Sequence, residues 1–487
     1  MDTSDVPLKV LQPPGAYSCR WHLVNNRGDL VVPQPHGTAN LLSEQSPSGS
    51  ISGEVPSPNS GAAWPDVVEC KRLAGELSNG AGVLFINAIL RIFGQPGEAG
   101  ISYPDGNAEV RAAMALVGPG ADLLENSRIR CIRVQVTGLD RVSGWTPIVA
   151  MTMPSRTFEM PESTWSVTTR RDGEQDWENV EMRLRVLHAG SVTVHADYQY
   201  GVKFTPYLEI DLREPVEALD AYNTVVQPIV RVLSIITGRK EEVTYLEMRP
   251  DGADMPFLQV FARPVRQAPY QPESNKLPNI ERALLRCHQD EVSLLEMVDS
   301  WQQMTVEQNP IVYTYDPFAL GEEQHPRARF LLLLQALEGL SNHENRLSDR
   351  QSAHEKKRGV AVSACMKVLT GANRKFIRNK LMASGVTLED RLRDMFETLP
   401  VSPMPYFDNL DIIVQVIRDN SGVTTTISAI QKVRNDLAHG SRTYSDRELL
   451  TLAQLLQVIV RVHALRVLGV NDEVQARALN GLLPYIG

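Results

Sequence analysis

The spacing of apolar residues changes at about residue 275, and this change limits the folds that the chain can adopt. Between residues 70 and 274 apolar residues mostly alternate with polar ones, as in "VTVHADYQYGVKF" (192–204), which predicts one long strand with a single wet face. Beyond residue 275 the spacing follows the period of a helix, as in "PRARFLLLLQALEGL" (326–340). We therefore expect a multidomain α+β protein in which a mostly antiparallel β domain precedes an all-α helical bundle.

Two stretches in the first half of the chain depart from this alternation. The stretch "LLSEQSPSGSISGEVPSPNSGAAWP" (41–65) is rich in Ser, Pro and Gly, which predicts a flexible loop or linker. The stretch "PVEALDAYNTVVQPIVRVLSIITG" (215–238) predicts a helix with Pro215 near its start, a kink at Pro228 and Gly238 past its end. The predicted organisation is an N-terminal segment with the loop (1–69), a β-rich domain (70–274), a connecting helix (275–310) and a helical domain (311–487).

Two further helices are predicted in the helical domain. One covers "NLDIIVQVIRDN" (409–420). The other is "LLTLAQLLQVIVRVHALRVL" (449–468), which a capping box of Ser445 and Glu448 in "SDRE" would open. Because this last helix is apolar nearly all round, it is either central in the bundle or covered by a partner subunit.

Composition excludes several classes of protein. The formal net charge is -9, so any face that binds nucleic acid must be local. The five cysteines are scattered and form no CxxC pair, which favours a reducing compartment over a disulfide framework or a zinc site. The start "MDTSDVPLKV" lacks the regions of a signal peptide, and no uncharged apolar run reaches the ~18 residues of a membrane span. We expect a soluble cytoplasmic protein with no membrane partner.

The sequence lacks the GxxxxGK[ST], HExxH and GxSxG motifs, so neither a metal nor a cofactor is expected. What remains is "VRNDLAHG" (433–440), where an apolar-periodic segment ends in an arginine, an asparagine and a histidine. Two interpretations stay open. The segment is a helix end with cations and a glycine cap, or it is a site for a phosphate and a proton.

Helix geometry bears on this choice. Asn435 and His439 are four residues apart and share one face, while Ile427, Ile430, Val433 and Leu437 would bury the other. Arg434 and His439 are five residues apart, which places them about 140° apart on an ideal helix. They converge on one phosphate only if the last turn unwinds at Gly440 or if a second subunit supplies the missing group. A dimer is therefore one of the two ways in which the motif can form a complete site.

The stretch "RNDLAHG" (434–440), late in a helical domain, resembles the HEPN superfamily (higher eukaryotes and prokaryotes nucleotide-binding). The stretches "RARFLLLLQALEGLSNH" (327–343) and "TLEDRLRDMFETL" (387–399) resemble earlier helices of the ApeA-like branch, and "DLREPVEALDAYNTVVQPIVRVLSIITG" (211–238) resembles the end of its N-terminal domain. The resemblance covers residues 70–487. It implies a metal-independent endoribonuclease of bacterial anti-phage, abortive defence that cleaves structured RNA such as tRNA. It also implies a homodimer through the HEPN domain and a phage-derived trigger.

The resemblance and the chemistry assign the same roles. The 2′-hydroxyl of RNA can attack its own 3′-phosphate, which leaves a 2′,3′-cyclic phosphate and needs no metal-activated water. We expect His439 to act as the general acid or base, Arg434 to stabilise charge on the phosphoryl oxygens, and Asn435 to position a hydrogen bond. Two alternatives remain, a capped helix end and a non-catalytic HEPN module that binds RNA or protein.

Glu338 is a further candidate for the catalytic site. It lies on the same side of its helix as Leu331 and Leu334, where a lone carboxylate is costly, so it needs a basic partner. Arg434 or His439 would make it part of the site, whereas another basic residue would make it a structural pair.

A basic run is the candidate RNA-binding surface, and its alternative is a merely solvated face. It contains no Asp or Glu and comprises Lys356, Lys357, Arg358, Lys367, Arg374, Lys375, Arg378 and Lys380.

More than half of the chain lies outside the helical domain, and a free ribonuclease would poison its own cell. We therefore expect the β domain to restrain the nuclease or to sense a signal, the alternative being an independent binding domain.

Overall fold

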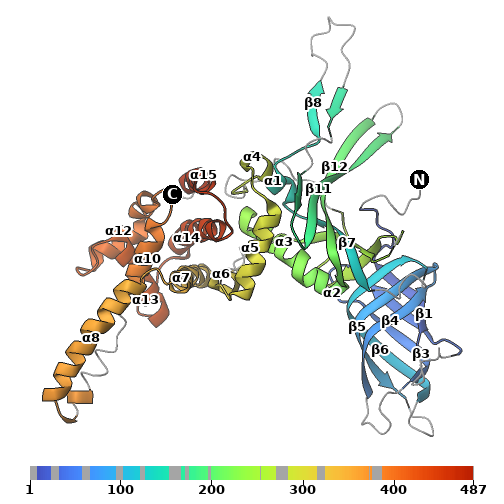
Figure 1. Cartoon of the computed structure of the whole chain (residues 1–487), viewed down its shortest axis with the longest axis horizontal. Coiled ribbons are helices and arrows are strands. Elements are labelled where there is room, and N and C mark those ends of the chain that lie inside the picture. The colour runs from blue at the N-terminus through green and yellow to red at the C-terminus, as the bar shows by residue number, and fades with distance from the viewer. Residues whose placement is uncertain are drawn as a thin grey trace, which may run out of the picture. The chain divides into compact units, whose positions relative to one another are not determined.

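The structure is a computed structural model (Figure 1) and confirms the predicted α+β multidomain class. It describes residues 8–23, 32–56, 66–94, 102–120, 127–152, 166–170, 175–195, 199–252, 254–269, 283–314, 324–371, 373–375 and 386–485. The chain divides into two compact units. Unit 1 comprises residues 1–233, 241–276 and 286–295, and unit 2 comprises residues 234–240, 277–285 and 296–487.

The first part of unit 1 is a closed antiparallel barrel, drawn in blue in Figure 1. Its strands are β1 (Gly15–His22), β2 (His36–Leu41), β3 (Ser48–Pro56), β4 (Asp66–Leu77), β5 (Ala81–Phe93) and β6 (Ser102–Pro119). The long strand β6 closes the barrel because it pairs with both β3 and β5. The rings of Trp21 and Phe85 meet edge to face in its core, 5.1 Å apart.

The prediction of a loop over residues 41–65 is wrong for residues 48–56, which form β3 between β2 and β6. Of these residues Ile51 and Val55 are fully buried in the barrel core. Small residues flank them because the neighbouring backbone is close: a Cβ on Gly49 would lie 2.2 Å from the carbonyl oxygen of Thr38. The segment therefore lacks the regular apolar alternation by which strands are recognised. Residues 57–65 of that stretch lie outside the described residues.

The sheet continues from β6 into a second, more open part of unit 1. The strands follow in the order β14 (Leu258–Ala262), β13 (Val243–Pro250), β7 (Arg128–Val136), β12 (Gln199–Glu217), β11 (Met182–His195) and β10 (Gln175–Glu178). A separate ladder joins β8 (Ile148–Thr152) and β9 (Ser166–Thr169), and the short α1 (Leu139–Ser143) follows β7.

The prediction of a single long strand over residues 192–204 is wrong, because β11 ends at His195 and β12 begins at Gln199. The two strands pair with each other, Val192 opposite Val202 and Val194 opposite Tyr200. Both arms of a hairpin keep the period of two, so alternation alone does not reveal where the chain turns.

The helix predicted over residues 215–238 forms from residue 218 onwards as α2 (Ala218–Ala221), a π-helical turn (Tyr222–Val226) and α3 (Gln227–Thr237). The π turn ends two residues before Pro228, the position of the predicted kink. Proline has no N–H to donate four residues back, and here the N–H of Gln227 bonds to the carbonyl of Tyr222, five residues back. Gly238, with φ 75°, ends the helix as predicted.

The span 275–310, predicted to be one connecting helix, contains two helices in its described part, α4 (Cys287–Asp290) and α5 (Leu294–Val306). Glu291 separates them because it adopts a left-handed conformation with φ 52°. The helices that follow are α6 (Pro310–Thr314), α7 (Pro326–His343), α8 (Ser348–Val368), α10 (Leu388–Glu397), α11 (Met404–Asp408), α12 (Asp411–Asp419), α13 (Thr426–His439), α14 (Asp446–Val467) and α15 (Asp472–Leu482), with a final 3-10 turn (Leu483–Tyr485).

α14 is the central helix of unit 2. Of the two alternatives for this segment, central in the bundle or covered by a partner subunit, the structure shows the first. α14 packs against α7, α11, α12 and α15, and its capping box of Ser445 and Glu448 forms as predicted. Among the described helices it alone is long and apolar enough to cross a membrane by length and composition, and 72% of that stretch is buried inside the protein. Burial of this kind is typical of a core helix.

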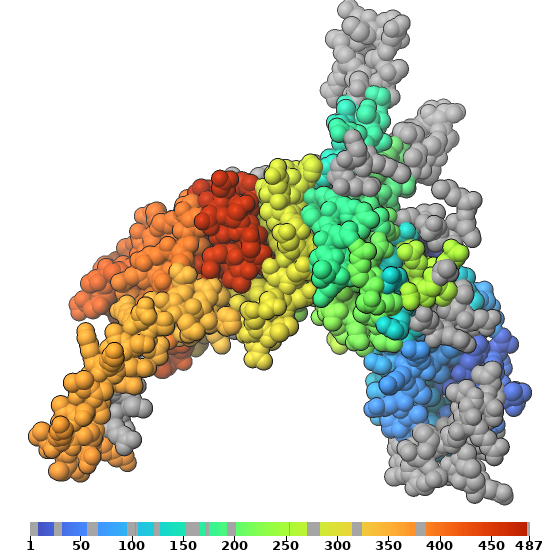
Figure 2. Space-filling model, in the orientation of Figure 1, coloured from blue at the N-terminus to red at the C-terminus, as the bar shows by residue number. Residues whose placement is uncertain are grey.

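α8 has the opposite character, because none of its residues is buried. Figure 2 shows it standing clear of the other helices of unit 2. Its charged and small residues are therefore presented to solvent or to another molecule.

Candidate functional site

The candidate site lies at the end of α13. Thr425 and Ser428 form a capping box at its start, and Gly440 ends it in the left-handed conformation with φ 67°. The four apolar residues predicted to face the core are buried, namely Ile427, Ile430, Val433 and Leu437. The helix thus provides a rigid support from which polar groups of the motif project.

Arg434 and Asn435 are half-buried and contact each other. Arg434 Nη1 donates a hydrogen bond to Asn435 Oδ1 across 3.2 Å. Within the described part of the chain, no carboxylate forms an ion pair with Arg434. This distinguishes it from nearby arginines such as Arg391 and Arg442, each of which binds a carboxylate. The guanidinium of Arg434 is oriented by an amide and remains available to an anion.

His439 is the last residue of α13 and is exposed. The helix stays regular up to this residue, since the N–H of Gly440 still bonds to the carbonyl of Asp436. The last turn therefore does not unwind, and residues 434 and 439 keep the separation of about 140° that an α-helix imposes. No hydrogen bond joins these two side chains in the described structure. Within one chain, the regular helix therefore does not bring these two side chains together on one face.

Asp436, inside the motif, is a functional candidate that the sequence analysis missed. Its side chain is 4% exposed, and it forms an ion pair with Lys432 and accepts hydrogen bonds from Ser441 and Tyr444, each at 2.8 Å. Burial raises the pKa of Asp436, but these three partners outweigh burial and hold the pKa below its usual value. The spacing of Lys432 and Asp436, four residues apart, was the available signal.

Arg327 is a second residue that the sequence analysis did not single out. It lies in the first turn of α7 and its guanidinium donates a hydrogen bond to the carbonyl oxygen of Leu437. A cation at this position satisfies a carbonyl at the negative end of α13. Arg327 therefore binds the start of α7 to the last turn of α13, at a carbonyl two residues before His439.

Glu338 does not contact the motif. Its carboxylate lies 2.6 Å from the guanidinium of Arg391 on α10, and both side chains are partly buried. Of the two alternatives that the sequence left open for Glu338, the structure shows the second, a structural pair with another basic residue, and the prediction that Glu338 belongs to the catalytic site is wrong.

The basic run starts on the exposed helix α8. Lys356, Lys357, Lys367, Arg374 and Lys375 are exposed, and Arg358 is partly so. Arg378 and Lys380 lie outside the described residues. Within the described residues, no group of three or more His, Cys, Asp or Glu side chains is arranged to hold a metal ion.

Two family models match the chain. The model described as ApeA N-terminal domain 1 matches residues 44–301, more than half of the chain, and the model described as Apea-like HEPN matches residues 331–474. The first match begins before residue 70, where the sequence resemblance was expected to start, and it includes β3. Neither a curated protein nor a solved structure matches the chain. The two domains together suggest a HEPN nuclease of anti-phage defence, and the chain belongs to the ApeA-like HEPN family.

Proposed function

We propose that this protein is a metal-independent endoribonuclease that cuts structured RNA and leaves a 2′,3′-cyclic phosphate. The observation that carries the proposal is that the HEPN helix α13 bears both an exposed histidine, His439, and a guanidinium, that of Arg434, which forms no ion pair with a carboxylate among the described residues. A phosphate diester needs a cation for its oxygens and a group that moves a proton, and these two side chains supply both.

The reaction follows from the chemistry of RNA. The 2′-hydroxyl attacks the adjacent phosphorus, the bond to the 5′-oxygen of the next nucleotide breaks, and a proton moves from the first oxygen to the second. The imidazole of His439 is suited to this proton transfer near neutral pH. Arg434 stabilises the charge that develops on the phosphoryl oxygens, and Asn435 holds the guanidinium through its amide oxygen.

The site requires two protomers in this proposal. Within one chain the regular helix holds Arg434 and His439 on different faces. A homodimer that pairs two copies of α13 through the HEPN domain would bring Arg434 of one protomer to His439 of the other.

The biological role that we propose is abortive anti-phage defence in the cytoplasm, with tRNA as the RNA class and a phage-derived molecule as the trigger. Unit 1 would restrain the nuclease until the trigger arrives. Expression of residues 296–487 tests the restraint, since it predicts growth arrest by the fragment, tolerance of the full chain and rescue by His439→Ala. Folding of the fragment is checked first, because Arg461 of α14 binds the carbonyls of Ile235 and Ile236, which the fragment lacks. A folded, dimeric fragment that is harmless would contradict restraint.

Incubation of the purified full chain with total RNA in EDTA tests the catalytic proposal. The expected products carry 2′,3′-cyclic phosphate ends, which are detected because their 3′ ends resist ligation until the phosphate is removed and a 3′-hydroxyl is left. RNA that stays intact while binding is measurable would contradict cleavage.

That second outcome defines the alternative function, a non-catalytic HEPN module that binds RNA or protein. One observation favours it, namely that a single chain keeps Arg434 and His439 apart. A monomeric protein in solution would therefore support the binding module.

A further inference from the structure

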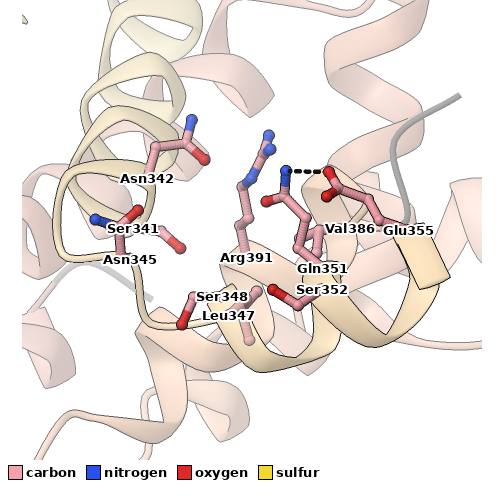
Figure 3. A pocket seen from close by; sticks show the side chains of 10 residues that line it. All are labelled: Ser341, Asn342, Asn345, Leu347, Ser348, Gln351, Ser352, Glu355, Val386 and Arg391. Atoms are coloured by element: carbon pink, nitrogen blue, oxygen red, sulfur yellow. Dashed lines mark hydrogen bonds between the residues drawn. The ribbon is translucent and has the colours of Figure 1, made fainter. Parts of the chain in front are cut away.

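A cavity lies inside the corner where α7 turns into α8, and α10 forms its floor (Figure 3). Its volume is about 250 Å³. The lining is mostly hydroxyl and amide groups, with two apolar residues, one carboxylate and one guanidinium. It comprises Ser341, Asn342, Asn345, Leu347, Ser348, Gln351, Ser352, Glu355, Val386 and Arg391.

The local sequence explains why these groups converge. Ser341 and Asn342 follow Glu338 by three and four residues, so all three share one face of α7. Asn345 then takes the left-handed conformation with φ 49°, which asparagine tolerates better than most residues, and the chain turns into α8. Gln351, in the first turn of α8, thereby lies opposite Asn342 across the cavity (Figure 3).

Arg391 is held in place by a carboxylate of α7. Its Nη1 binds Glu338 Oε1 at 2.6 Å, which leaves the rest of the planar guanidinium facing the cavity between Asn342 and Gln351 (Figure 3). Two ion pairs outside the cavity fix the corner to α10, Arg346 with Asp394 at 2.7 Å and Arg350 with Asp390 at 2.8 Å. The carboxylate of Glu338, which the sequence marked as needing a basic partner, thus positions an arginine.

The lining indicates the ligand. The volume is below the roughly 300–1,000 Å³ of sites for drug-sized ligands, so the cavity suits one ring system rather than a whole cofactor. Leu347 and Val386 offer apolar contact to a ring face, a guanidinium plane can stack on a base, and amides bind base edges. We propose that this cavity binds a single unstacked nucleobase, and that it prefers bases with an exocyclic amino group because Glu355 can accept from that group.

The base belongs to the RNA strand that the enzyme cuts, and this part of the inference rests on the proposed function. Lys356 and Lys357 are exposed on α8, the helix that carries Glu355, so this helix also offers cations for the phosphate backbone. The cavity is remote from the cleavage site of the same chain. Asn342 lies fifteen residues along α7 from Arg327, which contacts α13, and this corresponds to about 22 Å. The cavity therefore selects RNA and takes no part in the chemistry.

Binding of two matched oligonucleotides tests the inference in the full chain with His439→Ala, which removes cleavage. Fluorescein-labelled C12 and U12 differ in the exocyclic amino group of cytosine, and binding is followed by anisotropy at fixed salt. We expect C12 to bind at least about 5-fold more tightly than U12. Adding Asn342→Ala and Glu355→Gln should reduce this ratio to less than about 2-fold. Gln335→Ala removes an exposed amide from α7 outside the cavity and should leave the ratio unchanged.

Equal binding of C12 and U12 would overturn the inference, and so would a ratio that survives Asn342→Ala with Glu355→Gln. Saturation-transfer NMR with CMP and UMP distinguishes a base that belongs to an RNA strand from one that belongs to a free nucleotide. Binding of CMP as tight as that of C12 would indicate a free nucleotide, and weaker binding supports the strand. Discrimination without cleavage by the wild type would contradict the proposed function alone, whereas cleavage without discrimination would contradict this inference alone.

Discussion

The hydroxyl of Tyr444 donates a hydrogen bond to Asp436 Oδ2 across 2.8 Å, and this contact binds the loop after α13 back onto the helix. Ser441 donates to the other carboxylate oxygen, and the N–H groups of Gly440 and Ser441 both bond to the carbonyl of Asp436. His439 lies between these anchored positions. A buried carboxylate that the sequence analysis overlooked therefore fixes the end of the helix that carries the histidine.

Tyr444→Phe removes one hydrogen bond to this buried charge and should lower the free energy of unfolding by about 1.5–3 kcal/mol at neutral pH. The pKa of Asp436 is depressed in the folded state, so the stability it contributes is present above its unfolded pKa and is lost as pH falls through the folded value. The cost of Tyr444→Phe should therefore shrink in acid. Denaturant unfolding at pH 7 and pH 3 measures it. Tyr313→Phe, at an exposed tyrosine, is the control, and an equal cost in both variants would contradict the role of Tyr444.

Arg434→Lys should abolish most RNA cleavage although it keeps the charge, because an ammonium cannot bind phosphoryl oxygens with a planar fork. Removal of a comparable charge-stabilising donor costs about 10²–10³ in kcat. Initial rates on a defined RNA measure the loss, and circular dichroism confirms folding. Arg442→Lys is the matched control, since Arg442 binds Asp419 rather than an incoming anion. Wild-type rates for Arg434→Lys would remove Arg434 from the phosphate.

Lys356→Glu with Lys357→Glu should weaken RNA binding at low salt, because fewer phosphates are then neutralised by the protein. The slope of log K against log[salt] should become shallower by about 0.7 for each phosphate of a single strand that these lysines neutralise. Both residues are exposed on α8, so the fold should not change. Binding titrations between 50 and 200 mM salt, roughly the range in which such effects are large, measure the slope. Lys71→Glu on β4 is the control with the same type of charge reversal. An unchanged slope in the variant with Lys356→Glu and Lys357→Glu would mean that the basic run is merely a solvated face.

Glu247→Gln should stabilise unit 1 at pH 8 and not at pH 4. Burial raises the pKa of Glu247 to about 7, against the opposing effect of Arg133. At pH values between the pKa of Glu247 in the unfolded chain and its pKa of about 7 in the folded protein, the folded state binds more protons than the unfolded state. The free energy of unfolding therefore falls as pH rises through this range. Glutamine cannot ionise, and the gain at pH 8 is at most about 3 kcal/mol. Thermal unfolding at both pH values measures it, with the exposed Glu69→Gln as control. Equal midpoints for Glu247→Gln and wild type at pH 8 would contradict the burial cost.

Much of the fold and part of the site can be predicted from the sequence. Periodicity identified α7, α12 and α14, and the Ser445 capping box placed the start of α14, because these signals are local. The strand β3 was missed because its small residues serve a close approach of backbones rather than an apolar face. The partner of Glu338 could not be chosen, since Arg391 is distant in sequence and only the packing of α7 on α10 brings the two together.

The most direct test of the account mixes two inactive variants. If Arg434 of one protomer acts with His439 of the other, a dimer of Arg434→Ala with His439→Ala keeps one intact pair. After subunit exchange in an equal mixture, half of the dimers are mixed and each has one of two sites, so about a quarter of wild-type cleavage should return in EDTA. Each variant alone should remain inactive. If exchange is verified by a tag on one variant and the mixture stays inactive, the shared site is contradicted.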